Sequence, residues 1–242
     1  TEVYNIMSED YNTLEGYNPD ADLGLGCGLP TQFAKIKKGN TVIDLGSGAG
    51  NDCFIARNET GEDGRVIGID FTPAMIDKAR TNAEKLGFAN VEFRQGDIEK
   101  IPVSANIADV IVSNCVLNLV PDKDNVFKEI FRVLKPCGHF SISDVVLIGN
   151  LPEALCKDAE MYAGCVAGAI QKKAYLELIN LNVFSNVTIQ KEKVINIPDD
   201  ILKNYLNEQE LASFKTGNTG IFSITVYAEK PKSCGCGTDC CN

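Results

Sequence analysis

The sequence predicts a doubly wound α/β fold, and three observations support that prediction. Between residues 41 and 140, short apolar runs rich in β-branched residues alternate with longer amphipathic stretches, which is typical of a parallel sheet built from βαβ units. A glycine-rich turn follows the first run, and an acidic residue ends the second. We therefore expect a Rossmann-like sheet with a small C-terminal appendage.

Five strands and a well-defined helix are expected in the first part of the chain. Thr72 is a suitable N-cap, Pro73 fits the first helical position and Gly87 is a natural stop, so a helix is predicted over 72–86. The predicted strands cover residues 41–45, 65–69, 91–94, 108–113 and 139–145.

The alternation becomes irregular after residue 144. Two late strands joined through a helical insertion would give an antiparallel edge to the sheet. The elements expected there are helices over 152–167 and 174–181 and strands over 187–194 and 221–227. The chain is thus divided into a core over 1–150, helices and closing strands over 151–231, and a flexible cysteine-rich tail over 232–242.

Composition excludes several classes of partner. A net charge of −10 opposes binding to nucleic acid or to anionic membranes. No apolar run reaches the roughly 18 residues that a membrane span needs, and no export leader is visible. Ten cysteines are many for a chain of this size, but those before the tail lie within apolar segments, unlike the cysteines of a secreted disulfide scaffold. We therefore expect a cytoplasmic protein whose cysteines are thiols, with a small-molecule or metalloid substrate.

The glycine-rich turn is the strongest chemical signal. It comprises Asp44, Gly46, Ser47, Gly48 and Gly50, in a strand that runs into the start of a helix. Glycines at such a turn let the backbone approach a ligand in the crevice outside the strand ends. A dinucleotide fingerprint needs its third glycine one position later, so a nicotinamide oxidoreductase ranks last among the candidates.

Four ordered motifs resemble those of class I S-adenosylmethionine methyltransferases: the turn itself, Asp70 about twenty residues later, Gly96-Asp97-Ile98, and Ser113-Asn114. The resemblance implies that residues 1–150 bind S-adenosylmethionine. Asp70 would grip the ribose, Asp97 and Ile98 would flank the adenine with Met75 covering it, and the turn would hold the methionine part. Asn114 is included in this predicted cofactor site.

Two cysteines in small-residue settings narrow the resemblance. Cys27 lies in Gly26-Cys27-Gly28 and Cys165 in Gly164-Cys165-Val166. With the segments around Cys53 and Cys115, these closely resemble arsenite S-adenosylmethionine methyltransferases over roughly residues 20 to 180. The resemblance implies that Cys27 and Cys165 bind trivalent arsenic and are the catalytic residues, with residues 151–231 on the acceptor side.

Arsenic chemistry accounts for the choice of thiols. Soft thiolates select thiophilic ions, and the lone pair of trivalent arsenic can attack the activated methyl group. Methylation formally oxidises the arsenic, and thiols closing into a disulfide can return the electrons. A thiol reductant of the glutathione or thioredoxin type, or a reductant protein as partner, would then reset the enzyme.

The remaining cysteines and the single histidine are given other roles. Cys53 and Cys115 are expected to pack in the core, and Cys137 and Cys156 to be structural or incidental. His139 is expected to be a surface or turn histidine. The family's third arsenic thiol is missing where this chain has Ser223. A hydroxyl, an exogenous thiol or the cysteines of the tail could supply the third ligand, and the tail could also capture arsenic.

Two alternatives remain open. A methyltransferase of this fold could act on a small organic acceptor, because the glycine-rich turn alone does not define the substrate. A thiol-rich metalloid-binding protein could instead use the same fold as a scaffold. Failure to methylate arsenite would favour the first alternative, and failure to bind S-adenosylmethionine would favour the second.

Overall fold

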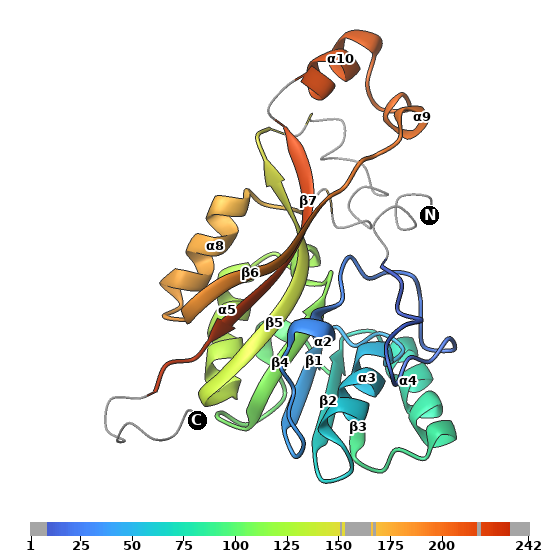
Figure 1. Cartoon of the computed structure of the whole chain (residues 1–242), viewed down its shortest axis with the longest axis vertical. Coiled ribbons are helices and arrows are strands. Elements are labelled where there is room, and N and C mark those ends of the chain that lie inside the picture. The colour runs from blue at the N-terminus through green and yellow to red at the C-terminus, as the bar shows by residue number, and fades with distance from the viewer. Residues whose placement is uncertain (1–8, 151, 153–165, 167, 217–218, 233–242) are drawn as a thin grey trace.

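The computed structural model describes residues 9–150, 152, 166, 168–216 and 219–232. These residues form a seven-stranded sheet in the order β3-β2-β1-β4-β5-β7-β6 (Figure 1). The first five strands are parallel, whereas β7 runs antiparallel to both β5 and β6. The predicted doubly wound fold with an antiparallel edge is confirmed.

All seven predicted strands are present. Their bounds are β1 Thr41–Leu45, β2 Arg65–Asp70, β3 Val91–Gln95, β4 Ala108–Asn114, β5 Leu134–Ile148, β6 Ser185–Val194 and β7 Gly220–Glu229. Only β5 begins much earlier than predicted, because Leu134 already pairs with Ala108 across a register shift. Cys137 and Gly138 then exchange backbone hydrogen bonds with Lys230, and Cys137 has a left-handed φ of 65°, so the strand is irregular between Leu134 and His139.

The helices cover the sheet and connect its strands. They are α2 Pro30–Phe33, α3 Asn51–Thr60, α4 Pro73–Leu86, α5 Lys123–Val133, α8 Lys172–Leu181, α9 Asp199–Leu202 and α10 Glu208–Thr216, with 3₁₀ turns η1 Ile98–Lys100 and η2 Leu117–Leu119. The predicted helix over 72–86 is confirmed, although the Thr72 side chain makes no capping bond. The helix expected over 152–167 lies largely outside the described residues, as does the tail over 233–242.

Alternate residues of β1 show how the core is divided. Ile43 and Leu45 pack in an apolar cluster with residues of α5 and α8, whereas Val42 packs on the other side with residues of α3 and α4. Successive side chains of a strand point to opposite faces, so both faces of the sheet are covered. Within the described residues, no helix is long and apolar enough to cross a membrane.

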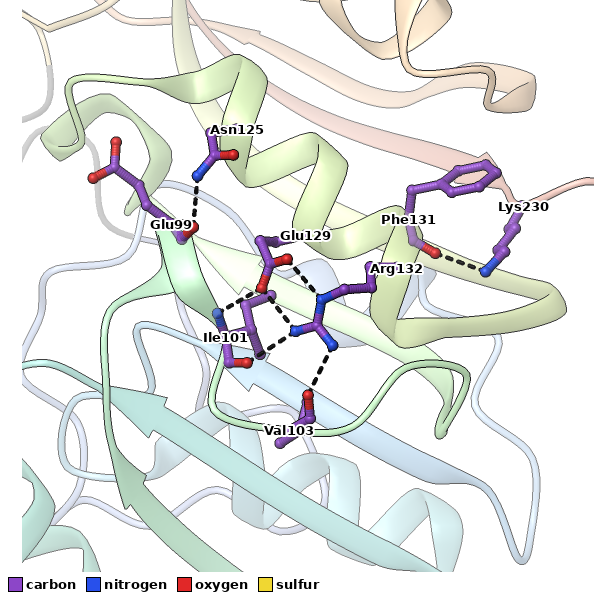
Figure 2. Close-up of polar contacts among 8 residues, drawn as sticks. All are labelled: Glu99, Ile101, Val103, Asn125, Glu129, Phe131, Arg132 and Lys230. Carbon is purple, nitrogen blue, oxygen red and sulfur yellow. Dashed lines mark hydrogen bonds and ion pairs between the residues drawn. The ribbon is translucent and has the colours of Figure 1, made fainter.

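Polar side chains of α5 fix the loop that follows β3 (Figure 2). The Arg132 guanidinium donates to both carboxylate oxygens of Glu129, at 2.6 and 2.7 Å, and to the carbonyl oxygens of Ile101 and Val103, each at 2.9 Å. Glu129 in turn accepts from the Ile101 amide at 2.8 Å, and Arg132 lowers the pKa of that carboxyl. The loop residues that precede Ile101 are thereby held against the helix.

Replacing Arg132 with Gln should lower the free energy of unfolding by about 1 to 3 kcal/mol, because two partly buried carbonyl groups lose their donor. Urea denaturation followed by circular dichroism measures the change. Lys128→Gln on the same helix is the matched control, since its ion pair with Asp124 is exposed and contributes little to stability. Equal losses for the two variants would show that Arg132 does not hold the loop.

Candidate functional site

A cavity of about 430 Å³ lies at the carboxyl ends of β1 and β4, which is where open α/β sheets bind their ligands. Its walls combine the loops that follow β1, β2, β3 and β4 with a segment that precedes β1. The lining residues are Tyr11, 21–23, 25–26, 46–49, 51–52, 70–72, Met75, 96–99, 114–116 and 119–121.

Asp70 fixes the glycine-rich turn to the start of α4. Its Oδ2 accepts from the Gly48 amide and its Oδ1 from the Thr72 amide, both at 2.9 Å. Gly46 has a φ of 75°, and a Cβ there would collide with the Val116 side chain. Glycine is required at this position because the backbone is left-handed and a neighbouring side chain approaches closely.

Eight of the ten predicted cofactor residues meet in the cavity wall. These are Gly46, Ser47, Gly48, Asp70, Met75, Asp97, Ile98 and Asn114. Asp44 and Gly50 are not among the lining residues. Asp44 is buried behind the turn, where burial raises its pKa and it accepts from the Cys53 thiol at 3.3 Å, while Gly50 lies where a Cβ would meet the Phe54 and Phe93 rings.

The ionisable lining residues carry a single sign of charge. Among the described residues they are Asp22, Asp52, Asp70, Asp97 and Glu99, and no Lys, Arg or His side chain lines the cavity. Ser47 is only 6% exposed, and its hydroxyl has no hydrogen-bond partner within the described chain. A buried hydroxyl of this kind suits a bound polar group. The charges suit a cationic ligand and oppose a pyrophosphate.

Asn114 connects this cavity to the segment that carries Cys27. Its side-chain amide nitrogen donates to the Tyr11 hydroxyl and, at 2.8 Å, to the Gly28 carbonyl. Its carbonyl oxygen accepts from the Cys27 amide at 3.1 Å. Tyr11 was not predicted as a site residue, since 103 positions separate it from Asn114 and no local pattern marks it.

Cys27 and Cys115 belong to one apolar cluster next to the cavity, which also includes Val145 and Val166. The two cysteines are 0% and 5% exposed. Cys115 lines the cavity itself and has a strained φ of 60°. The sequence prediction that Cys115 only packs in the core therefore missed its position in the site.

The other predicted residues have different surroundings. Cys165 lies outside the described residues, although Val166 next to it packs in the cluster of Cys27. Ser223 donates to the Cys27 carbonyl and thus anchors the backbone. Cys53 is buried, as predicted. His139 is not in a turn but within β5, half-buried, with its Nε2 2.6 Å from the Ala34 carbonyl oxygen, and burial lowers its pKa.

Comparison with known proteins identifies the family. The methyltransferase domain family matches residues 36–203. The chain belongs to this methyltransferase family. It is 54% identical over 211 residues to an arsenite methyltransferase of Halobacterium salinarum, covering 87% of this chain and 52% of the relative. A second arsenite methyltransferase, from Aquipseudomonas alcaligenes, is 36% identical over 195 residues, which cover 78% and 56% of the two chains.

A solved structure agrees with these relatives. It is the arsenic(III) S-adenosylmethionine methyltransferase CrArsM from Chlamydomonas reinhardtii, with 32% identity and a TM-score of 0.71, covering 88% of this chain and 70% of that one. The methyltransferase described here spans about half the length of the two curated relatives above.

Replacing Asn114 with Ala in this methyltransferase should speed amide hydrogen exchange of Cys27 and its neighbours by about tenfold or more, because the Cys27 amide loses its bond to the Asn114 side chain. The Gly28 carbonyl loses one donor and keeps the Tyr11 hydroxyl at 3.2 Å. Exchange followed by mass spectrometry measures the effect. Asn58→Ala is a matched control, since the Asn58 amide bonds only an exposed carboxylate in the described structure. Unchanged exchange around Cys27 in Asn114→Ala would contradict the assigned network.

Proposed function

We propose that this chain is the cofactor-binding, methyl-transferring part of an arsenite methyltransferase, which moves a methyl group from S-adenosylmethionine to thiol-bound trivalent arsenic. One observation carries the proposal: two cysteine side chains, Cys27 and Cys115, lie buried beside a cavity whose charged lining residues are all acidic. The identity to relatives named arsenite methyltransferases supports it.

The cavity suits S-adenosylmethionine in size and charge. The cofactor carries an ammonium and a sulfonium against one carboxylate, so its net charge is positive and opposite to that of the lining residues. Asp70 retains acceptor capacity for the ribose hydroxyls beyond its two backbone bonds. Ile98 and Met75 provide apolar surface for the adenine, and the 46–48 turn with the Ser47 hydroxyl would hold the methionine part.

The acceptor site is built from thiols. Thiolates displace the hydroxyls of arsenite as water, which leaves the arsenic with a lone pair and soft sulfur ligands. That pair attacks the methyl carbon as the bond from carbon to the sulfonium breaks, and S-adenosylhomocysteine leaves. The cavity's part in this step is to align the two reactants and exclude water.

Cys115 completes a set of three thiols with Cys27 and Cys165. The sequence analysis left the third arsenic ligand to a hydroxyl, to an exogenous thiol or to the cysteines of the tail. Ser223 instead bonds the Cys27 backbone, while Cys115 shares the apolar cluster of Cys27. Two of the three thiols can close into a disulfide and give two electrons to the oxidised methylarsenic product.

The full cycle then needs a reductant for that disulfide, and we assign this role to a thiol reductant of the glutathione or thioredoxin type. A reducing compartment keeps such thiols available, so we place the reaction in the cytoplasm. Its physiological role would be arsenic detoxification.

Replacing Cys27, Cys115 or Cys165 with Ser should each lower the rate of arsenite methylation by at least about a hundredfold while leaving S-adenosylmethionine affinity within about twofold, because the thiols hold the acceptor and not the donor. Methylated arsenic is measured by mass spectrometry, and cofactor affinity by calorimetry. Cys53→Ser is the matched control, since Cys53 is a buried cysteine that does not line the cavity. Cys137 is unsuitable because it is disulfide-bonded.

Either of two results would favour one of the alternative functions over this proposal. If the unsubstituted protein binds S-adenosylmethionine but never methylates arsenite in the presence of thiol, an organic acceptor is indicated. If it binds arsenite but no S-adenosylmethionine, the chain is a metalloid-binding protein.

A further inference from the structure

The carboxyl group of Asp52 is the acidic group of the cavity wall that lies nearest to the glycine-rich turn in sequence. Its Oδ2 accepts from the Tyr11 hydroxyl at 3.0 Å and from the Asn114 amide at 3.4 Å. Among the described residues, Oδ1 accepts a hydrogen bond only from the Thr31 hydroxyl, at 3.5 Å. A carboxylate can accept about four hydrogen bonds, so Oδ1 has acceptor capacity to spare.

No cation balances this carboxyl group within the described part of the chain. Every ion pair found there involves other acids. The titratable groups that influence Asp52 or are influenced by it are Tyr11, Asp22, Asp44 and Cys53. Each of these side chains is neutral when protonated and negative when ionised, so none of them supplies a positive charge. Burial raises the pKa of Asp52 to about 6.

A second, independent feature marks the same place as a ligand site. The hydroxyl of Ser47 is buried in the cavity wall and has no partner in the described chain. Ser47 and Asp52 lie on either side of Gly50, in the turn and at the start of α3. An orphaned hydroxyl and an unbalanced carboxylate together fit a group that has both an acceptor and a cationic donor, such as the carboxylate and ammonium of an α-amino acid.

We propose that Asp52 binds the ammonium group of the methionine part of S-adenosylmethionine, with Tyr11 and Asn114 as the residues that position it. This inference rests on the proposed function. An ammonium donates up to three hydrogen bonds, whereas a sulfonium donates none. The spare acceptor capacity of Oδ1 therefore favours the ammonium as its partner, in a charge-assisted hydrogen bond.

Binding of that ammonium favours the ionised form of Asp52. In the free protein the group is half protonated near pH 6, so cofactor binding at this pH must release protons, and affinity must fall as the pH drops through 6. Asp144 also has a raised pKa, about 7, because it is buried, but it does not line the cavity. Asp144 is unchanged in an Asp52 variant and therefore serves as an internal reference for proton release.

The test compares three ligands on Asp52→Asn by isothermal titration calorimetry. S-adenosylmethionine and S-adenosylhomocysteine both carry the ammonium, whereas methylthioadenosine lacks it and retains adenosine. Asp52→Asn should raise the Kd of the first two by about 10- to 100-fold and leave that of methylthioadenosine unchanged. Asp77→Asn, an exposed acid on α4, is the matched control and should bind all three ligands normally.

Proton release is a measurement that would not change if Asp52 had only a structural role. Titrations at pH 6 in buffers of different ionisation enthalpy should show proton release on S-adenosylmethionine binding to the wild-type protein and none with Asp52→Asn. Tyr11→Phe removes a hydrogen bond to the ionised form, so it should shift the midpoint of the pH dependence upward.

The possible outcomes of these titrations distinguish the ways in which the assignment of Asp52 could be wrong. Loss of methylthioadenosine binding in Asp52→Asn to the same extent would overturn the assignment and leave Asp52 a structural residue. A loss confined to S-adenosylmethionine would overturn it in favour of contact with the sulfonium. If the wild-type protein binds neither S-adenosylmethionine nor S-adenosylhomocysteine, the proposed function fails and this inference fails with it.

Discussion

The side chain of Asn114 joins two parts of the chain that the sheet alone would leave unconnected. It stands at the last position of β4, so the strand's pairing to β1 and β5 fixes its backbone. From there its amide donates to Gly28 and accepts from Cys27. The position of Cys27 beside the cavity thus depends on hydrogen bonds to a rigid strand end, which holds a side chain more firmly than a loop would.

The single sign of charge around the cavity has consequences beyond affinity. Burial raises the pKa of Asp52 and Asp44, and repulsion from neighbouring carboxylates raises it further. Both effects disfavour the ionised groups until a cation binds. In the proposed reaction the donor loses one positive charge as its sulfonium becomes a thioether. The same carboxylates would therefore hold the donor more tightly than the product S-adenosylhomocysteine, which assists exchange of product for a new donor.

The fold could be predicted from sequence because its signals are local. Alternation of apolar runs located every strand, and Pro73 and Gly87 located the ends of α4. The start of β5 was missed, since its first residues pair with β4 and Lys230 across an irregular segment around Cys137 that no local pattern marks as a strand. The turn at 46–48 and Asp70 were found because their spacing along the chain is characteristic of the family.

The rest of the site depends on contacts between distant positions. Tyr11 meets Asp52 across 41 positions and Asn114 across 103, and no periodicity encodes such a meeting. Cys115 was misjudged because its apolar neighbours resemble those of any core cysteine; its left-handed backbone and its place in the cavity wall appear only in three dimensions. Asp44 belongs to the motif but is buried behind the turn, so motif membership did not imply contact with the cavity.

The central claim is that protein thiols hold arsenic beside the methyl donor site. X-ray absorption spectroscopy at the arsenic edge, on the protein loaded with arsenite and S-adenosylhomocysteine, tests it most directly. Three thiols in one site predict a first coordination shell of three sulfur atoms and no oxygen. A shell that keeps oxygen ligands, or an arsenic spectrum identical to that of free arsenite, would contradict the claim.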